Sequence, residues 1–380
     1  MKKLSYIVFI PLLLSICSCN VIRFNQALQV NENEDWLTSG GNPQKTNISN
    51  SKALLTPPFV LLWDYNLEAG ISKNSISASD GVVFINSLSG NLQALNIFNG
   101  KSLGKLDLGD AIFSTPLIYK NYVICTFSGN DNYSILCYDL RGGAIVWQKN
   151  LDNIESSPII IDEKIIVSTT EGEIVQLNLK DGKQLWNFRL PDSRFGFYNT
   201  PSFYDTKILT GASDGYLYSL DFLTGKELWK FKTNASINSD VSIYNNRIFF
   251  GSDDGNLYCL DGTGSLLWKK NLSSKVISSC AFYKENVIVS AVNGYIYSVN
   301  AETGIENWSF RTEGTIHASP LVKDNKIFIG SFDFYFYCIG AELGDMLWKY
   351  KTEGRIRSSA VIWKEYIMIG CDPKYFYCFK

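Results

Sequence analysis

The stretch Gly215-Tyr-Leu-Tyr-Ser-Leu-Asp-Phe-Leu-Thr-Gly-Lys-Glu-Leu-Trp229 decides the fold, because related copies of it recur along the chain. A tryptophan marks each copy but one, and most neighbouring marks lie about 40 residues apart. The one double interval, which follows Trp63, holds Gly104 in the skipped position. A repeat of about 40 residues with four short strands per unit is typical of a β-propeller. The marks are Trp63, Trp147, Trp186, Trp229, Trp268, Trp308 and Trp348.

One unit of the repeat shows the four strands that we expect in every blade. Its strand-like runs lie at residues 154–161, 164–168, 173–178 and 184–189. Gly-containing turns such as Ser213-Asp-Gly215 join the second run to the third, because Gly accepts the positive φ of a tight hairpin. A stretch such as Asp221 to Gly225 joins the third run to the fourth, and its Gly fits a left-handed position. Each unit therefore predicts a four-stranded antiparallel sheet.

The number of blades follows from the two ends of the repeat. Seven complete units run from residue 71, and an eighth begins at Arg355 and contributes three strands up to Lys380. The missing fourth strand, with its tryptophan, is Leu61-Leu-Trp63-Asp-Tyr65. Pairing this strand into the last blade removes two sheet edges and closes the ring. We therefore predict an all-β, eight-bladed propeller over residues 59–380, in which each tryptophan packs against the neighbouring blade.

Composition supports one large β domain and argues against a nucleic-acid partner. Of the 380 residues, 46% are hydrophobic and 14% are aromatic, which is ample material for a β core. The formal net charge is −2, and the basic residues are scattered. Long-range attraction therefore favours neither nucleic acid nor an acidic membrane surface.

The first residues look like a bacterial lipoprotein signal. Two lysines precede an apolar run from Leu4 to Ile16, which is too short to span a bilayer as a helix of about 20 residues. The run ends in Cys17-Ser-Cys19, which resembles a lipobox. We predict a lipoprotein signal peptide over residues 1–19, acylated at Cys19. Cys17 is the alternative acylation site, and an ordinary signal peptide with incidental cysteines also stays open.

Residues 20–58 are polar and loop-like, which predicts a spacer between the membrane and the propeller. Trp36 is the exception within this stretch. A lone tryptophan in a polar tail is poorly placed in water, so we expect it to tuck against the propeller.

The other seven cysteines predict buried free thiols rather than a disulfide framework. Four of them share one repeat position that elsewhere holds Ala, Ser or Gln, which indicates a small core slot. Equivalent slots in different blades lie too far apart for a disulfide, which needs Cα atoms within about 7 Å. The pair that could bridge is Cys371 and Cys378, on either side of one hairpin. The shared position is occupied by Cys137, Cys259, Cys338 and Cys378, and elsewhere by Ala94, Gln176, Ser219 and Ser298.

The run from Gly215 to Trp229 resembles the repeat of the pyrroloquinoline quinone (PQQ)-like propellers, over about 320 residues of this chain. Within that superfamily the lipobox, the polar spacer, the compact blades and the segment from Trp36 to Gly41 look like the BamB family of outer-membrane β-barrel assembly lipoproteins. The resemblance implies a non-enzymatic scaffold without a cofactor, anchored by lipid in the outer membrane and facing the periplasm. It also implies that the scaffold binds the central barrel-inserting protein of the assembly machinery. Exposed strand edges could additionally pair with unfolded outer-membrane protein substrates.

Two alternatives from other functional classes stay open. One is a PQQ-dependent periplasmic dehydrogenase, or a propeller that binds a quinone or a sugar. The resemblance to those enzymes would imply an adjacent Cys-Cys pair, a calcium site and a catalytic Asp in long insertions, and this sequence has neither the adjacent pair nor the insertions. The other alternative is a sensor or a cell-wall-binding propeller.

One irregular junction indicates a localised partner surface. The loop from Leu190 to Phe197 is three residues longer than its counterparts, and it carries Arg194 and Phe195, a pair with the chemistry of a binding anchor. The BamB resemblance places the partner site near this junction and adds acidic residues of the following blade, where only Asp240 qualifies. We therefore predict Arg194, Phe195 and Asp240 as partner-binding residues, with an ordinary surface loop as the alternative.

Alignment of the inner strands predicts one residue per blade near the mouth of the central channel. A catalytic or cofactor site on the propeller axis would use this ring, but its members share no metal-ligand set, and we predict neither catalytic residues nor a metal. Asp-Gly pairs such as Asp214-Gly215 indicate turns rather than calcium sites. Glu155 and Arg357 face each other across several blades and could meet only through a ligand. The ring is Ser72, Phe113, Glu155, Tyr198, Asn238, Ile277, His317 and Arg357.

Overall fold

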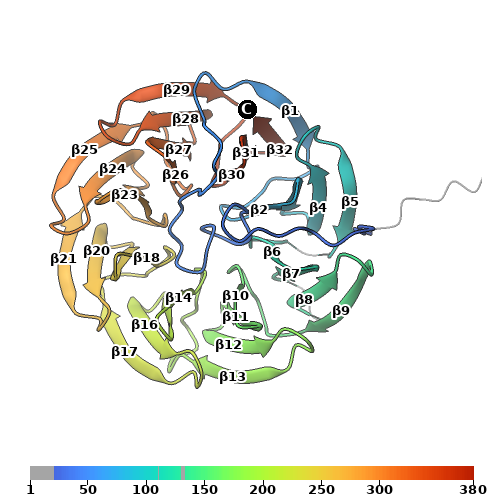
Figure 1. Ribbon diagram of the computed structural model, residues 1–380. Coiled ribbons are helices and arrows are strands. Elements are labelled where there is room, and N and C mark those ends of the chain that lie inside the picture. The colour runs from blue at the N-terminus through green and yellow to red at the C-terminus, as the bar shows by residue number, and fades with distance from the viewer. Residues whose placement is uncertain (1–20, 110, 130–132) are drawn as a thin grey trace, which may run out of the picture.

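Eight four-stranded antiparallel sheets form a closed ring in the computed structural model, which describes residues 21–109, 111–129 and 133–380 (Figure 1). The prediction of an all-β, eight-bladed propeller is confirmed. Each blade has its first strand beside the central channel and its fourth strand at the rim. Over the residues described, no helix is long and apolar enough to cross a bilayer.

The first four blades contain sixteen consecutive strands. They are β2 (Ile76–Ser79), β3 (Val82–Asn86), β4 (Asn91–Asn96) and β5 (Ser102–Asp107); β6 (Leu117–Tyr119), β7 (Tyr122–Thr126), β8 (Ile135–Asp139) and β9 (Ala144–Lys149); β10 (Ile159–Ile161), β11 (Lys164–Ser168), β12 (Glu173–Asn178) and β13 (Gln184–Arg189); β14 (Ser202–Tyr204), β15 (Lys207–Gly211), β16 (Tyr216–Asp221) and β17 (Glu227–Lys232).

The other four blades take the remaining strands. They are β18 (Ser242–Tyr244), β19 (Arg247–Gly251), β20 (Asn256–Asp261) and β21 (Leu266–Asn271); β22 (Ala281–Tyr283), β23 (Asn286–Ser290), β24 (Tyr295–Asn300) and β25 (Glu306–Arg311); β26 (Leu321–Lys323), β27 (Lys326–Gly330), β28 (Tyr335–Gly340) and β29 (Met346–Lys351); β30 (Val361–Trp363), β31 (Tyr366–Cys371), β32 (Tyr375–Phe379) and β1 (Leu61–Asn66).

Blade 8 is closed by the strand from the other end of the chain, as predicted. Its order is β1-β32-β31-β30, and Trp63 on β1 lies opposite Cys378 on β32. Two backbone hydrogen bonds between Val60 and Lys380, of 2.8 and 3.0 Å, extend the pairing beyond the strand. The ring therefore has no open seam between its first and last blades.

Six of the seven repeat tryptophans cover a glycine turn of the next blade, and Trp348 packs on Phe59 and Phe379 instead, which confirms the predicted packing between blades. Trp186 lies on Gly225, and its Nε1 donates to the Phe222 carbonyl at 3.0 Å. Gly225 has φ +70°, and a Cβ there would stand 2.5 Å from Trp186 Cε3, so only glycine fits. Across the strand pair, Trp186 faces Gln176, a member of the predicted small slot. The same contact joins Trp63 to Gly100, Trp147 to Gly182, Trp229 to Gly264, Trp268 to Gly304 and Trp308 to Gly344.

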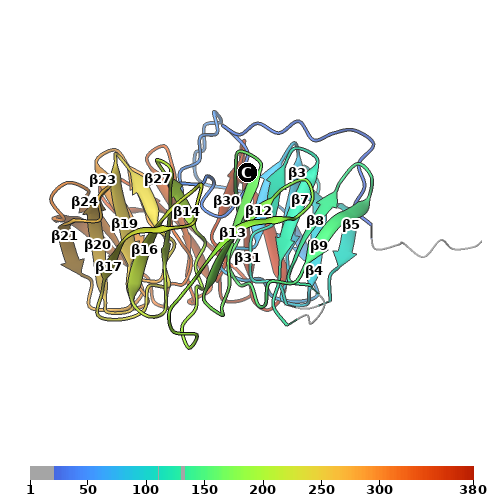
Figure 2. The same cartoon turned by 90° about the horizontal axis from the view of Figure 1, so that it is seen from below.

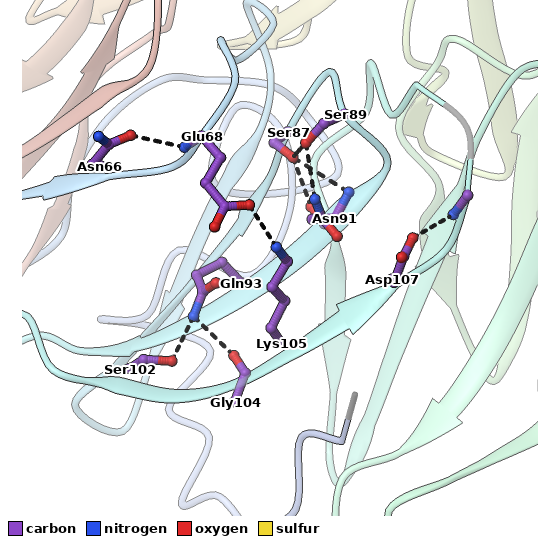
Figure 3. A network of polar contacts seen from close by, with 11 residues as sticks. Asn66, Glu68, Ser87, Ser89, Asn91, Gln93, Ser102, Gly104, Lys105 and Asp107 are labelled. Carbon is purple, nitrogen blue, oxygen red and sulfur yellow. Dashed lines mark hydrogen bonds and ion pairs between the residues drawn. The ribbon is translucent and has the colours of Figure 1, made fainter. Parts of the chain in front are cut away.

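The skipped tryptophan at Gly104 has a structural replacement that the repeat pattern does not show. Ile22 forms a β-bridge with Gly104, and a Cβ on Gly104 would lie 2.5 Å from the Val21 carbonyl oxygen. Arg23 then covers Gly143 of the next blade, where an indole would otherwise lie. Beside this bridge Gln93 donates to Ser102 Oγ at 2.7 Å and to the Gly104 carbonyl at 3.0 Å (Figure 3). Residues from before the first blade therefore complete the contact between blades 1 and 2.

The inner strands are shorter than predicted. The run at 154–161 forms only the three-residue strand β10, whereas the other three runs of that unit match β11, β12 and β13. Ahead of the inner strands, side-chain oxygens of neighbouring blades accept the backbone N–H groups that a strand ladder would otherwise bind. Thr115 N–H donates to Ser157 Oγ at 2.8 Å, and Ser157 N–H donates to Thr200 Oγ1 at 3.3 Å. We call these hydroxyl-bearing residues around the channel, which include Thr115, Ser157 and Thr200, the inner belt.

The N-terminal segment packs on one face of the ring and enters the channel (Figures 1 and 2). Trp36 is 5% exposed and exchanges backbone hydrogen bonds with Ala78, which confirms that it tucks against the propeller. Carbonyls of Pro43 and Gln44 accept N–H groups of inner strands β14 and β18. Residues 21–58, which we expected as a spacer, are thus part of the packed body. The predicted signal peptide, with Cys17 and Cys19, lies outside the described residues.

All seven cysteines of the propeller are free and buried, as predicted. Cys371 and Cys378, the pair that could have bridged, are directed to different partners. Cys371 Sγ contacts the Tyr377 hydroxyl at 3.9 Å, and Cys378 Sγ contacts the Ile97 carbonyl at 3.9 Å. Burial raises the pKa of the Cys137 thiol to about 12, so these side chains behave as small apolar groups.

Candidate functional site

The long connection between β13 and β14 is anchored at its base and exposed at its tip. Leu190 N–H and Phe197 N–H donate to the carbonyls of Gly172 and Thr169, in a turn of blade 3, at 2.9 and 3.0 Å. Gly196 N–H donates to Ser213 Oγ of blade 4 at 2.9 Å. Two blades therefore hold the loop, and Figure 2 shows it extending beyond the other connections, away from the N-terminal segment.

Arg194 stands at the exposed tip of this loop in a fixed geometry. Its side chain is 81% exposed and forms an ion pair with Asp192, with Nη2 and Oδ2 2.6 Å apart. Its guanidinium also lies 5.8 Å from the centre of the Phe195 ring, which is half-buried. Hydrogen bonds from Arg194 lower the pKa of Asp192 to about 2, so the pair stays charged at neutral pH. The structure thus brings the predicted Arg194 and Phe195 together on one surface.

Asp240 lies elsewhere than Arg194 and Phe195. It is 2% exposed and replaces a hydroxyl of the inner belt in blade 5. One of its oxygens accepts Thr200 N–H at 2.9 Å, and the other accepts the Ser39 hydroxyl at 3.2 Å. Its carboxylate is therefore engaged with the N-terminal segment inside the channel, rather than presented beside the loop.

Lys45, a buried lysine of the N-terminal segment, explains why the inner belt carries the carboxylate of Asp240 in place of a hydroxyl. Lys45 is 0% exposed, and its Nζ donates to the Ser39 carbonyl at 2.8 Å. Burial lowers the pKa of Lys45 to about 8, and the charge of Asp240 opposes that shift. The segment that carries Lys45 therefore closes the channel at one end and places an ammonium group within the electrostatic influence of Asp240. Sequence reasoning missed Lys45, and its signal was only a lysine two residues from Pro43 in a polar stretch.

The predicted ring of eight residues surrounds one cavity of about 330 Å³ at the other end of the channel. We call this cavity the cup. Lys73, which sequence reasoning also missed, lines both the cup and the contact with the N-terminal segment, so it separates the two. The alignment of inner strands therefore located the cup correctly, although nothing in the repeat showed that it is closed below.

The cup contains no arrangement typical of a metal-dependent enzyme. Within the described ranges, no three His, Cys, Asp or Glu side chains are grouped so as to hold a metal ion. Burial and the nearby Arg357 and Lys73 lower the pKa of His317, and its ring stacks on Phe332 at 4.5 Å. The turn aspartates are occupied too, since Asp214 Oδ2 accepts the Tyr218 hydroxyl at 2.6 Å.

Comparison with known families identifies the relatives of this propeller. The family model described as "Outer membrane protein assembly factor BamB" matches residues 60–196 and 213–322, which is more than half of the chain. The chain belongs to the BamB family. Its similarity to individual BamB proteins is modest. It is 28% identical to BamB of Escherichia coli (strain K12) over 118 residues, and 27% identical to BamB of Yersinia pestis over 135 residues.

These alignments cover 30% and 31% of this chain, and only 29% and 34% of the two BamB relatives. The crystal structure of BamB from Moraxella catarrhalis is similar to 85% of this chain and 99% of that one, with a TM-score of 0.73 and 17% identity. The quinohemoprotein alcohol dehydrogenase of Comamonas testosteroni has a TM-score of 0.80 at 13% identity, covering 92% of this chain and 81% of that one. At such identities the structural likeness shows the fold alone, so the BamB family rests on the sequence match.

Proposed function

We propose that this BamB-family protein is a non-enzymatic scaffold of the outer-membrane β-barrel assembly machinery, and that it binds the central barrel-inserting subunit. The observation that carries the proposal is the loop 190–197, which presents an exposed Arg194 beside Phe195 on a base fixed by two blades. Arginine and aromatic side chains are enriched among residues that dominate binding energy. Because the loop is held at both ends, little conformational freedom would be lost on binding.

The N-terminal segment from residue 21 and the proposed partner loop lie on opposite faces of the ring. The N-terminal segment contacts turns between first and second strands, as in the hydrogen bond from Gln29 N–H to Asp80 at 2.9 Å. Loop 190–197 instead leaves the opposite ends of the strands and packs beside the turn at Gly172. With acylation at Cys19, three residue-to-residue steps of at most about 3.6 Å each separate Cys19 from Ile22, which is bound to Gly104. The anchored face would thus lie against the outer membrane, and Arg194 would face the periplasm.

Substitution of Arg194 by Glu tests the partner loop. Arg194→Glu reverses the exposed charge, and we expect the variant to retain less than a tenth of the barrel-inserting subunit in a pull-down from membranes. The free energy of unfolding should change by less than about 0.5 kcal/mol, because the ion pair with Asp192 is exposed. Lys226→Glu is the matched control, since Lys226 is exposed in a turn of blade 4 on the other face.

Full retention of the subunit by Arg194→Glu would remove this loop from the binding site. Equal loss with Lys226→Glu would mean that net charge, rather than this surface, controls the association. Unfolding of Arg194→Glu would assign Arg194 a structural role instead.

A further inference from the structure

The cup is a dead-end site of the size that small molecules occupy. Lys73 extends from blade 1 across the channel, where its Nζ donates to the Ile277 carbonyl of blade 6 at 2.5 Å. Beneath Lys73 the N-terminal segment fills the channel with Ser39, Gly40 and Asn47. The volume of about 330 Å³ is at the lower end of the roughly 300–1,000 Å³ typical of ligand pockets. Phe113 of blade 2 and Tyr198 of blade 4 add aromatic side chains to the wall of the cup, between blades 1 and 6.

Two cationic side chains, Lys73 and Arg357, line one side of the cup together with two carboxylates, Asp240 and Asp372. Lys73 of blade 1 and Arg357 of blade 8 are neighbours in the ring. Asp240 is the carboxylate that opposes the lowering of the pKa of both Lys73 and Lys45, so one negative charge faces two ammonium groups. Arg357 approaches Asp372 at 3.6 Å, which leaves most of its five N–H donors free. A carboxylate in the cup would therefore find strong donors on this side.

The opposite side of the cup carries an unpaired acid. Glu155 of blade 3 lines the cup and is only partly exposed, and no residue in the described ranges gives it a hydrogen bond or an ion pair. Burial and the charge of Glu171 raise its pKa. A partly buried carboxylate without a protein partner is available to a ligand that supplies a donor. Two blades lie between those of Glu155 and Arg357, so one ligand with opposite charges at its ends could satisfy both.

The cationic side is also held in place before any ligand arrives. The Arg357 guanidinium lies 5.1 Å from the centre of the Phe332 ring, and the His317 ring stacks on the same ring at 4.5 Å. Side chains that are fixed in this way lose little freedom on binding, which favours affinity.

We propose that the cup binds a small zwitterion with an apolar side chain, an amino acid or a short peptide, whose carboxylate contacts Arg357 and Lys73 and whose ammonium contacts Glu155. The apolar side chain lies against Phe113 and Tyr198. This site is independent of the proposed partner loop, because it uses none of the exposed residues at 190–197.

Calorimetric titration with the dipeptide L-alanyl-L-phenylalanine tests the proposal. We expect saturable one-to-one binding at dipeptide concentrations up to about 1 mM. N-acetylation of the dipeptide removes the ammonium, amidation removes the carboxylate, and each should weaken binding about tenfold or more, because charge-assisted hydrogen bonds are lost.

Two variants assign the two ends of the ligand. Glu155→Gln should weaken the free dipeptide about tenfold and leave the weaker affinity of the N-acetyl form unchanged. Arg357→Gln should weaken binding of the free dipeptide similarly and leave the weaker affinity of the amidated form unchanged. Arg355→Gln is the matched control, since Arg355 also contacts Phe332, at 5.8 Å, but does not line the cup. Melting curves of all three variants should match the parent.

Three results would overturn the proposal. The first is no heat of binding with the free dipeptide. The second is equal loss of the free and capped forms in Glu155→Gln, which would mean that Glu155 does not meet the ammonium. The third is equal weakening by Arg355→Gln and Arg357→Gln, which would place the ligand outside the cup. Any of these results would leave the proposed partner loop unaffected, since the pull-down with Arg194→Glu measures a different surface.

Discussion

Replacing Gly225 by Ala should destabilise the propeller much more than replacing Gly255 by Ala. Both glycines have positive φ, of +70° and +85°, so an alanine in either place adopts an unfavourable backbone conformation. The two sites differ in the space for a methyl group. At Gly225 the new Cβ would lie 2.5 Å from Trp186, whereas at Gly255 the nearest atom is 3.4 Å away.

The expected difference in the free energy of unfolding follows from these distances. A left-handed conformation costs a non-glycine residue about 1–2 kcal/mol, and this part is common to both variants. The overlap at Gly225 adds the effect of overpacking, about 1–3 kcal/mol, because the indole is fixed by its hydrogen bond to the Phe222 carbonyl. Gly225→Ala should therefore lose about 2–5 kcal/mol and Gly255→Ala about 1–2 kcal/mol.

Urea denaturation followed by tryptophan fluorescence measures both values, with an unchanged dependence on urea expected for each variant. A double variant separates the two causes. In a Trp186→Leu background the overlap is removed, so Gly225→Ala should cost only the backbone part, and the coupling between the two sites should be about 1–3 kcal/mol. Equal destabilisation by Gly225→Ala and Gly255→Ala, or additive effects in the double variant, would refute the view that the indole makes this glycine necessary.

Three further outcomes are expected. The pKa of Lys45 is lowered from 10.5 to about 8, so between these pH values the unfolded chain binds more protons and the stability due to Lys45 rises with pH. The free energy of unfolding of the parent, measured relative to Lys45→Met, should therefore increase by up to about 3 kcal/mol between pH 8 and 10.5. A constant difference between the two proteins would contradict the burial of the ammonium group. A soluble form that begins at residue 21 should show no thiol reactive towards a chromogenic disulfide while folded and seven in denaturant without reductant, whereas five would reveal a disulfide. Incubation with PQQ and calcium should give neither stoichiometric quinone absorbance nor dye reduction, and either signal would favour the dehydrogenase alternative.

The repeat predicted the architecture well because every blade uses the same local chemistry. The tryptophan, the small slot opposite it and the turn glycine of the next blade form one packing unit, so a period of about 40 residues implied the number of blades and their closure. The same regularity located the residues around the cup. The inner strands were predicted too long, since serine and threonine hydroxyls of the inner belt replace strand hydrogen bonds, and an apolar run alone does not reveal this substitution.

The contributions of the N-terminal segment could not be predicted from the repeat. Ile22 and Arg23 complete the blade that lacks a tryptophan, and Lys45 is buried in the channel, where the charge of Asp240 acts on it. These contacts join residues up to about 200 positions apart, as between Ser39 and Asp240, and they depend on tertiary geometry that a polar loop sequence does not encode visibly. For this reason Asp240 was assigned to the partner surface from its place in the sequence, while the structure engages it inside the channel.

The central claim, that this propeller is a scaffold of outer-membrane protein assembly, is tested most directly by its partners in the membrane. The full-length protein, tagged after Lys380, would be affinity-purified from detergent-solubilised membranes, and the co-purifying proteins identified by mass spectrometry against an untagged control. We predict that the barrel-inserting subunit co-purifies in near-stoichiometric amount and that Arg194→Glu reduces it at least tenfold. If no component of the assembly machinery is enriched above the control, the proposed function is contradicted, while the eight-bladed fold and the membership of the BamB family stand.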